Sequence, residues 1–137
     1  MQDFRELKVW QKAHQLALAV YSITRKFPRE EIYGLTSQMR RAAVSIAANI
    51  AEGRGSDGDR TFRRYLRTAM GSAFELEYYF ILTKDLLYVS ETEHNRLVSQ
   101  ITEVRRMLTS LIQTLKASMR NGSKSGASGK GKGRFSG

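Results

Sequence analysis

The chain has 137 residues, a length that fits one domain with a substantial hydrophobic core. It contains no cysteine, which excludes disulfides and thiolate zinc sites. Its formal net charge is +10, from 23 lysines and arginines against 13 aspartates and glutamates. A charge this high favours association with polyanions and carries no information about the fold. Nucleic acid is therefore the expected partner, and a solvated basic surface is the alternative.

No targeting or membrane segment is expected. The first eight residues, MQDFRELK, include acidic side chains and no apolar stretch, unlike a secretory signal. The longest run of apolar and small residues, 42–51, is about half of the roughly 20 residues that span a bilayer. We expect a cytoplasmic protein.

The first predicted helix covers residues 6–27 and the second covers 36–52. In both, apolar positions recur at alternating spacings of four and three, which is typical of helices that pack against other helices. Pro28 ends the first helix, because the residue before a proline is disfavoured in the α region. Thr36 is the expected N-cap of the second helix.

The second helix contains the stretch RRAAVSIAANIAEG, residues 40–53, which is rich in alanine. Side chains this small allow a close approach of neighbouring helices. Asn49 occupies a seam position where a coiled coil would place a large apolar residue, and we expect it to fix the register against the next helix.

Glycines and aspartates between residues 53 and 59 form the clearest break, and a third predicted helix follows over 60–87. The motif Ser90-Glu-Thr-Glu93 predicts a capping box that opens the fourth helix. Four amphipathic helices with short loops predict an all-α, antiparallel up-down-up-down four-helix bundle over residues 1–118. Residues 119–137 are rich in glycine, serine and lysine and are predicted to be a disordered basic tail.

Three separated motifs carry a resemblance to a known family: LKVWQKAHQLALAVYSITRKFP, then YGLTSQMRRAAVSIAANIAEG, then FRRYLRTAMGSAFELEYYFILTKDLLYV. Over residues 4–117 the chain resembles the four-helix-bundle proteins encoded in intervening sequences of bacterial 23S ribosomal RNA genes. The resemblance implies a ring-shaped homopentamer. A distant relative is the accessory variability determinant of diversity-generating retroelements, a basic bundle that binds nucleic acid and a reverse transcriptase.

The predicted topology gathers the charge at one end of the bundle. Residues 1–15, 45–73 and 104–137 share this pole and hold sixteen bases and five acids, a net charge of +11. The bases expected to bind nucleic-acid phosphates are Arg5, Lys8, Lys12, Arg54, Arg60, Arg63, Arg64, Arg67, Arg105, Arg106, Lys116, Lys124, Lys130, Lys132 and Arg134. Binding of this kind is steeply dependent on salt. Alternatively, individual arginines pair with carboxylates of a neighbouring subunit.

Two further sets of residues are predicted to be structural. Asn49, Ser72 and Glu75 are expected to form a buried hydrogen-bond network between the second and third helices. Trp10, His14 and Tyr21 form a second stripe on the first helix and are expected at a subunit interface.

No enzyme signature emerges. His14 and His94 lie in different helices, and a single Glu91-Thr-Glu-His94 is short of the paired motifs of a di-iron bundle. The glycine-rich turn lacks the Gly-Lys-Ser/Thr of a phosphate-binding loop. We therefore expect no catalytic residues, metal or cofactor, and predict a homo-oligomeric adaptor that binds RNA or DNA. The alternative is a protein–protein scaffold, for example for a reverse transcriptase, whose charge serves solubility.

Overall fold

The protein is described by a computed structural model over residues 3–128, and the surroundings of its side chains over residues 3–122. Four long helices account for most of this part: α1 (Lys8–Thr24), α2 (Leu35–Arg54), α3 (Gly58–Asp85) and α4 (Glu91–Ser128). Two short 3-10 helices, η1 (Phe4–Glu6) and η2 (Arg29–Glu31), precede α1 and α2. No strand occurs between residues 3 and 128, and the predicted all-α class with four helices is confirmed.

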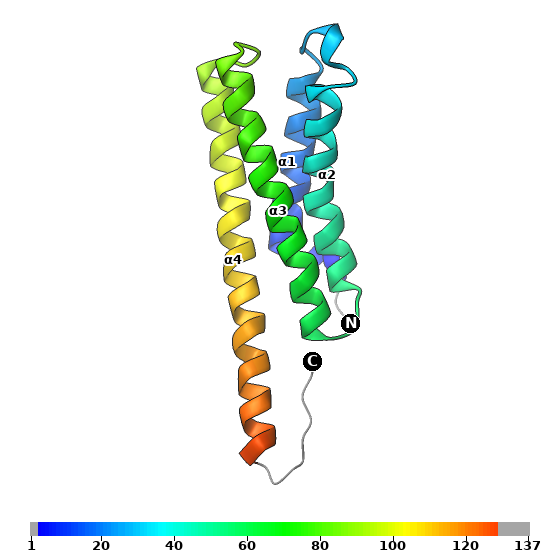
Figure 1. Cartoon of the computed structure of the whole chain (residues 1–137), viewed down its shortest axis with the longest axis vertical. Coiled ribbons are helices and arrows are strands. Elements are labelled where there is room, and N and C mark those ends of the chain that lie inside the picture. The colour runs from blue at the N-terminus through cyan, green and yellow to red at the C-terminus, as the bar shows by residue number, and fades with distance from the viewer. Residues whose placement is uncertain (1–2, 129–137) are drawn as a thin grey trace.

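The helices lie side by side, and the loops that join them fall alternately at the two ends of the molecule (Figure 1). The contact between α2 and α3 is the most extensive, and α1 also packs against α4. At the lower end of Figure 1, α4 projects well beyond the loop between α2 and α3. One end of the molecule therefore carries a free helical arm.

The hydrophobic core follows the four-three seams read from the sequence. On α1, the buried positions include Ala13, Leu16 and Val20, whereas Ile23 packs only at the edge of the core. The other large, fully buried side chains come from the remaining helices and are Met39, Ile46, Ile50, Leu66, Leu76, Phe80, Ile101, Val104 and Leu108. Each helix thus contributes one apolar face, as amphipathic helices do when they form a bundle.

The alanine-rich stretch of α2 lies in the closest helix contact. Ala42 and Ala43 are buried, and Gly53 ends the same face. A Cβ atom added to Gly53 would lie 2.7 Å from Cβ of Tyr65 and 2.9 Å from Cδ1 of Phe62. Because real Cβ atoms do not approach so closely, only glycine fits between α2 and α3 at this level.

Several predicted helix boundaries differ from the structure. The first helix, predicted over residues 6–27, spans Lys8–Thr24 and ends before it reaches Pro28. The third, predicted over 60–87, spans Gly58–Asp85.

The second helix begins at Leu35, and Thr36 is a buried residue of its first turn. The Leu35 N–H donates to Oε1 of Glu31 at 3.1 Å, so a carboxylate from η2 satisfies the helix start that Thr36 was expected to cap.

The fourth helix continues to Ser128, through residues 119–128, which were predicted to be disordered. Residues 129–137 of the predicted tail lie outside the described part.

The predicted capping box at the start of α4 is confirmed. The Ser90 N–H donates to Oε1 of Glu93 at 2.9 Å, and the Glu93 N–H donates to the Ser90 hydroxyl at 3.1 Å. The reciprocal bonds satisfy two N–H groups that a helix start otherwise leaves unpaired.

Candidate nucleic-acid interface

Four arginines at the start of α3 form the centre of the candidate site. Arg60, Arg63, Arg64 and Arg67 follow the spacing i, i+3, i+4 and i+7 and lie opposite the buried residues of the helix. We call them the α3 arginine face. Among the side chains described, none of the four forms an ion pair with a carboxylate. Like charges at these spacings repel, by a few tenths of a kcal/mol per pair. An anion bound at this face would relieve that repulsion.

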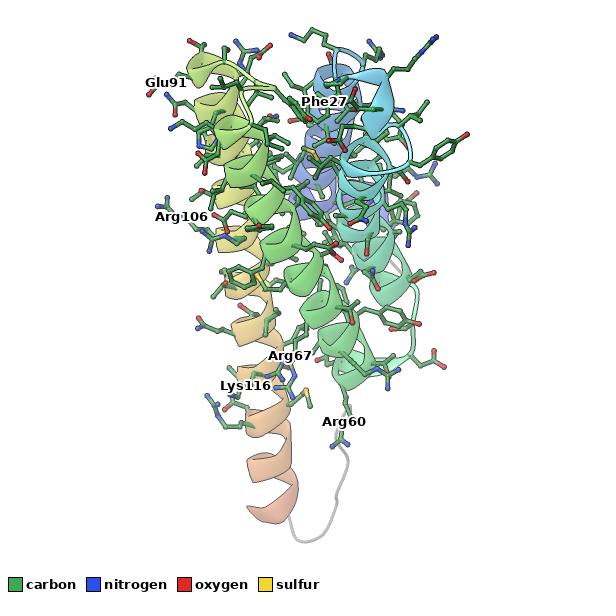
Figure 2. All side chains as sticks on the ribbon, turned by 45° about the horizontal axis from the view of Figure 1, so that its top comes forward. Phe27, Arg60, Arg67, Glu91, Arg106 and Lys116 are labelled. Atoms are coloured by element: carbon green, nitrogen blue, oxygen red, sulfur yellow. The ribbon has the colours of Figure 1, made fainter. Side chains whose placement is uncertain are left out.

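Lys116 of α4 lies at the same end of the molecule as Arg60 and Arg67, away from Phe27 and Glu91 (Figure 2). It is exposed, as are Arg60 and Arg67. Lys116 thus adds a base from α4 to the same end of the molecule as the α3 arginine face.

Lys8 and Arg106 form a second basic group. They flank a groove between α1 and α4 whose apolar wall includes Leu7, Met107 and Leu111. Both bases are exposed, and neither pairs with a carboxylate among the described side chains. The structure therefore brings Lys8 and Arg106 together across the helix pair.

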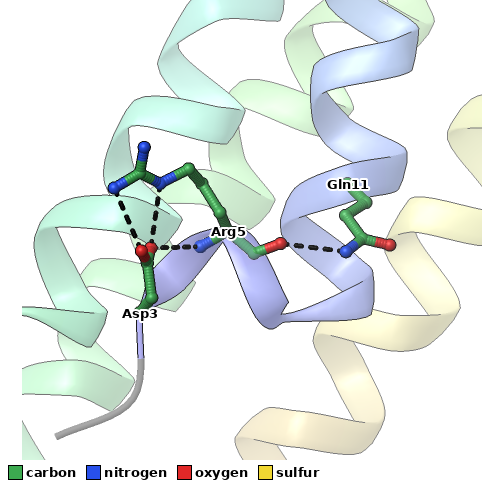
Figure 3. Close-up of polar contacts among 3 residues, drawn as sticks. All are labelled: Asp3, Arg5 and Gln11. Carbon is green, nitrogen blue, oxygen red and sulfur yellow. Dashed lines mark hydrogen bonds and ion pairs between the residues drawn. The ribbon is translucent and has the colours of Figure 1, made fainter.

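Arg5 is held by an acid. Its guanidinium lies 3.0 Å from Oδ2 of Asp3, and its backbone N–H donates to the same carboxylate at 2.9 Å (Figure 3). The amide of Gln11 donates to the Arg5 carbonyl oxygen at 2.9 Å (Figure 3). The hydrogen bonds from Arg5 lower the pKa of Asp3. Arg5 therefore adds little positive charge to the surface.

Two more of the predicted phosphate-binding bases pair with acids of other helices. Nζ of Lys12 lies 3.5 Å from Oε2 of Glu103, and Nε of Arg105 lies 3.2 Å from Oε1 of Glu77. The Arg105 guanidinium also stacks over the Phe74 ring, 5.3 Å from its centroid. These pairs reduce the charge that Lys12 and Arg105 offer to phosphates, because each base already faces a carboxylate within the bundle.

Arg54 differs again from the α3 arginine face. It is half-buried, and its guanidinium lies 5.9 Å from the centroid of the Phe62 ring. Through this cation–π contact Arg54 helps to join α2 to α3. Of the remaining predicted bases, Lys124 lies within α4, where only the backbone is described, and Lys130, Lys132 and Arg134 lie outside the described residues.

The predicted polar network has a different arrangement. The Asn49 side chain donates to the carbonyl oxygen of Ser45 at 2.8 Å and to its hydroxyl at 3.1 Å, within α2. The Ser45 and Ser72 hydroxyls are hydrogen-bonded at 2.8 Å and join α2 to α3. The predicted burial of Glu75 is wrong, since its carboxylate is exposed and accepts a hydrogen bond of 2.8 Å from Tyr79. Ser45, absent from the prediction, is the residue that contacts α3.

The predicted interface residues of α1 occupy two separate positions. The Trp10 and His14 rings stack, with centroids 5.0 Å apart and an interplanar angle of 6°. Tyr21 lies under the guanidinium of Arg40, which is 4.5 Å from the centroid of the Tyr21 ring.

Two exposed apolar side chains lie beside Tyr21. Leu18 is one turn before Tyr21 on α1, and Val44 is one turn after Arg40 on α2. We call Leu18, Tyr21 and Val44 the α1–α2 stripe.

A second apolar stripe was missed from the sequence. Phe74, Tyr78 and Ile81 follow the spacing i, i+4 and i+7 on α3, and each is about half exposed. This α3 stripe continues the line of the α3 arginine face toward the other end of the helix. The signal was present as an apolar spacing outside the seam, but exposure could not be assigned before the packing face of α3 was known.

Neither histidine lies in a metal-binding cluster of the described chain. Over residues 3–128, no group of three histidine, aspartate or glutamate side chains is arranged to hold a metal ion. Nδ1 of His94 lies 3.2 Å from the Phe80 carbonyl oxygen, a contact that ties α4 to α3. Within the same residues, no helix combines the length and the apolar character needed to cross a bilayer.

Fold and surface together define a small basic all-α protein with four arginines on one face at the start of α3, none of them paired with a carboxylate among the described side chains. The chain belongs to the 23S rRNA-intervening sequence protein family, whose sequence profile matches residues 5–110. The resemblance read from the three motifs is confirmed. A comparison with curated proteins finds no match.

Among solved structures, the chain is similar to a protein of unknown function of the S23 ribosomal protein family from Bacteroides thetaiotaomicron. The TM-score is 0.72 at 24% sequence identity, over 77% of this chain and 95% of that one. At this identity the similarity establishes a shared fold.

Proposed function

We propose that the protein is a cytoplasmic, non-enzymatic adaptor that binds RNA or DNA through the phosphate backbone. The observation that carries the proposal is the α3 arginine face, whose four guanidinium groups have no carboxylate partner among the described side chains. Lys116 on the α4 arm, together with Lys8 and Arg106 across the groove, extends the basic surface. Cations that an acid does not neutralise are those that release counterions from a nucleic acid.

Geometry supports a contact with phosphates more than a contact with bases. The arginines lie along the outer face of a helix that packs on both α2 and α4. No zinc module or other base-reading motif accompanies them in the sequence. Such a surface binds many sequences with similar affinity, and its binding weakens steeply with salt.

We further propose that the up-down-up-down bundle assembles side by side into a ring, with the α1–α2 stripe of one copy against the α3 stripe of the next. The two stripes lie on different helices, so their contact is head-to-tail, and repeated contacts of this kind form a ring when the rotation between neighbouring copies closes. A pentamer is the number that the family resemblance implies. A ring would multiply the basic surface by its number of subunits.

The exposed stripes also support the second candidate function, a scaffold for another protein such as a reverse transcriptase. Apolar side chains that are half exposed at helical spacing are typical of surfaces that bind protein. In that case nucleic acid would not bind through the α3 arginine face.

Substitution of the arginine face separates the two candidates. Arg60→Gln, Arg63→Gln and Arg67→Gln combined should weaken binding of a labelled RNA at least tenfold at low salt, measured by fluorescence anisotropy. The matched control places the same number of charge losses at the other pole: Arg29→Gln, Lys84→Gln and Arg96→Gln. An equal loss in both variants, or no loss in either, would contradict binding through the α3 arginine face.

A further inference from the structure

Two loops at the end opposite the basic surface expose large apolar side chains. The loop before α2 carries Ile32 and Tyr33, and the turn after α3 carries Leu86 and Leu87. Tyr33 is 92% exposed and Leu87 is 87% exposed. We call these four residues the loop platform.

The loop platform is held together by contacts between its two loops. The Tyr88 hydroxyl donates to Oε2 of Glu31 at 2.9 Å, and the rings of Phe27 and Tyr88 lie 5.3 Å apart. Lys26 forms an ion pair with Glu93, at the start of α4. The exposed apolar side chains therefore project from a fixed surface.

Leu87 adopts a backbone conformation that glycine would favour. Its φ is 65°, in the left-handed region, and it is the one non-glycine residue with a positive φ in the described chain. The Leu87 N–H donates to the Lys84 carbonyl oxygen, and the Tyr88 N–H donates to that of Thr83. These two bonds define a Schellman motif, in which this position is usually glycine.

The left-handed backbone of Leu87 costs stability, and its side chain, 87% exposed, gains little from packing within the chain. Strain of this kind persists at positions where the side chain serves a function. Because the side chain is apolar and faces outward, that function is contact with another apolar surface.

The distribution of charge between the two ends of the molecule indicates which apolar surface the loop platform contacts. The half of the molecule around the loop platform holds seven bases and eight acids, against a net charge of +11 in the other half. Two copies that met at their basic ends would repel one another. Two copies that met at their loop platforms would bring together nearly neutral apolar surfaces and keep the basic ends furthest apart.

We infer that the loop platform is the contact between two copies of this chain, or between two rings, joined end to end. Such a pair presents one basic surface at each of its two ends. It therefore brings two nucleic-acid segments to one particle. The end-to-end contact stands on the loop platform alone, whereas the bridging of nucleic acids rests on the proposed function.

Sedimentation velocity of the full chain without nucleic acid tests the contact. The variant carries Ile32→Ser, Tyr33→Ser and Leu87→Gly, which remove the apolar surface and relieve the backbone strain. We expect its particle mass to be half that of the wild type, with unchanged helix content by circular dichroism. A control with Glu30→Gln, Lys84→Gln and Arg96→Gln at the same end should keep the full mass.

Equal masses for the wild type and the platform variant would overturn the inference. Flotation of the wild type with phosphatidylcholine vesicles, lost in the variant while the masses stay equal, would also overturn it and assign the surface to a bilayer. The bridging has its own readout, energy transfer between two differently labelled RNAs. Loss of that transfer in the platform variant, with its RNA affinity unchanged, supports the inference. Unchanged transfer in a platform variant whose mass is halved would overturn the bridging and leave the end-to-end contact standing.

Discussion

The hydroxyl group of Tyr88 donates a hydrogen bond of 2.9 Å to Oε2 of Glu31 and joins the turn after α3 to the loop before α2. The other oxygen of the same carboxylate accepts the backbone N–H of Leu35, at the start of α2. One acid thus supports a helix start and a contact between loops 57 residues apart in sequence. The arrangement explains how two short loops form a single fixed surface.

Replacing Tyr88 with phenylalanine should lower the thermal midpoint by about 3 °C, because the ring stays and only the bond to Glu31 is lost. Tyr33→Phe is the matched control, since Tyr33 is almost fully exposed and forms no hydrogen bond with any described residue. Differential scanning calorimetry of the three proteins measures the difference. An equal midpoint for wild type and Tyr88→Phe would contradict a stabilising bond.

The same bond predicts a dependence on pH. The hydrogen bond to Glu31 raises the pKa of Tyr88, because the carboxylate favours the neutral phenol. A group with a raised folded-state pKa contributes fully below its unfolded pKa, near 10 for tyrosine, and loses that contribution as the pH rises through the folded value. The difference in midpoint between wild type and Tyr88→Phe should therefore be constant up to about pH 9 and shrink above about pH 10.

Gly53→Ala should destabilise the protein by about 1–3 kcal/mol, because the added methyl overlaps Tyr65 and Phe62 where α2 meets α3. Gly71→Ala is the control, since a Cβ there has no atom within 4 Å. In the exposed interior of α3 that change should stabilise by about 0.5–1 kcal/mol through helix propensity. Urea unfolding of both variants gives the two signs. If both substitutions stabilised the protein, the close contact of Gly53 with Tyr65 and Phe62 would not determine the effect of the added methyl.

Leu87→Gly should raise the free energy of unfolding by about 1 kcal/mol, since glycine adopts a positive φ without the clash of a Cβ. The neighbouring Leu86→Gly should lower it by a similar amount, because Leu86 has a helical φ of −81°. Urea unfolding at low protein concentration compares the two. A destabilised Leu87→Gly variant would mean that the leucine side chain packs within the single chain.

Much of the fold could be predicted because helix packing leaves a periodic trace. The seam through Ala13, Leu16 and Val20, and the capping box at Ser90 and Glu93, are both local patterns. The start of α2 was predicted to within one residue, but the group that caps it could not be, because Glu31 reaches the helix from a separate 3-10 turn. The left-handed backbone of Leu87 could not be predicted either, since such a position at the end of a helix is normally predicted from a glycine.

The candidate site also has features that could be predicted from the sequence and features that could not. The spacing of the α3 arginines follows from the sequence, and the structure places all four on one face. Which other bases are neutralised depends on the register between helices, as the pairs Lys12–Glu103 and Arg105–Glu77 illustrate. Asn49 shows the same limit: its partners lie one turn away on its own helix, while Ser45 makes the bond to α3.

The affinity of the full chain for a labelled single-stranded RNA, measured over a series of salt concentrations, tests the proposed function most directly. Each phosphate neutralised on a single strand contributes about −0.7 to the slope of log K against log salt. Five contacts, by the four arginines of the α3 arginine face and Lys116, therefore predict a slope of about −3.5, which becomes shallower after Arg60→Gln, Arg63→Gln and Arg67→Gln. A flat plot, or no binding at the lowest salt, would contradict the proposal that this basic surface binds nucleic acid.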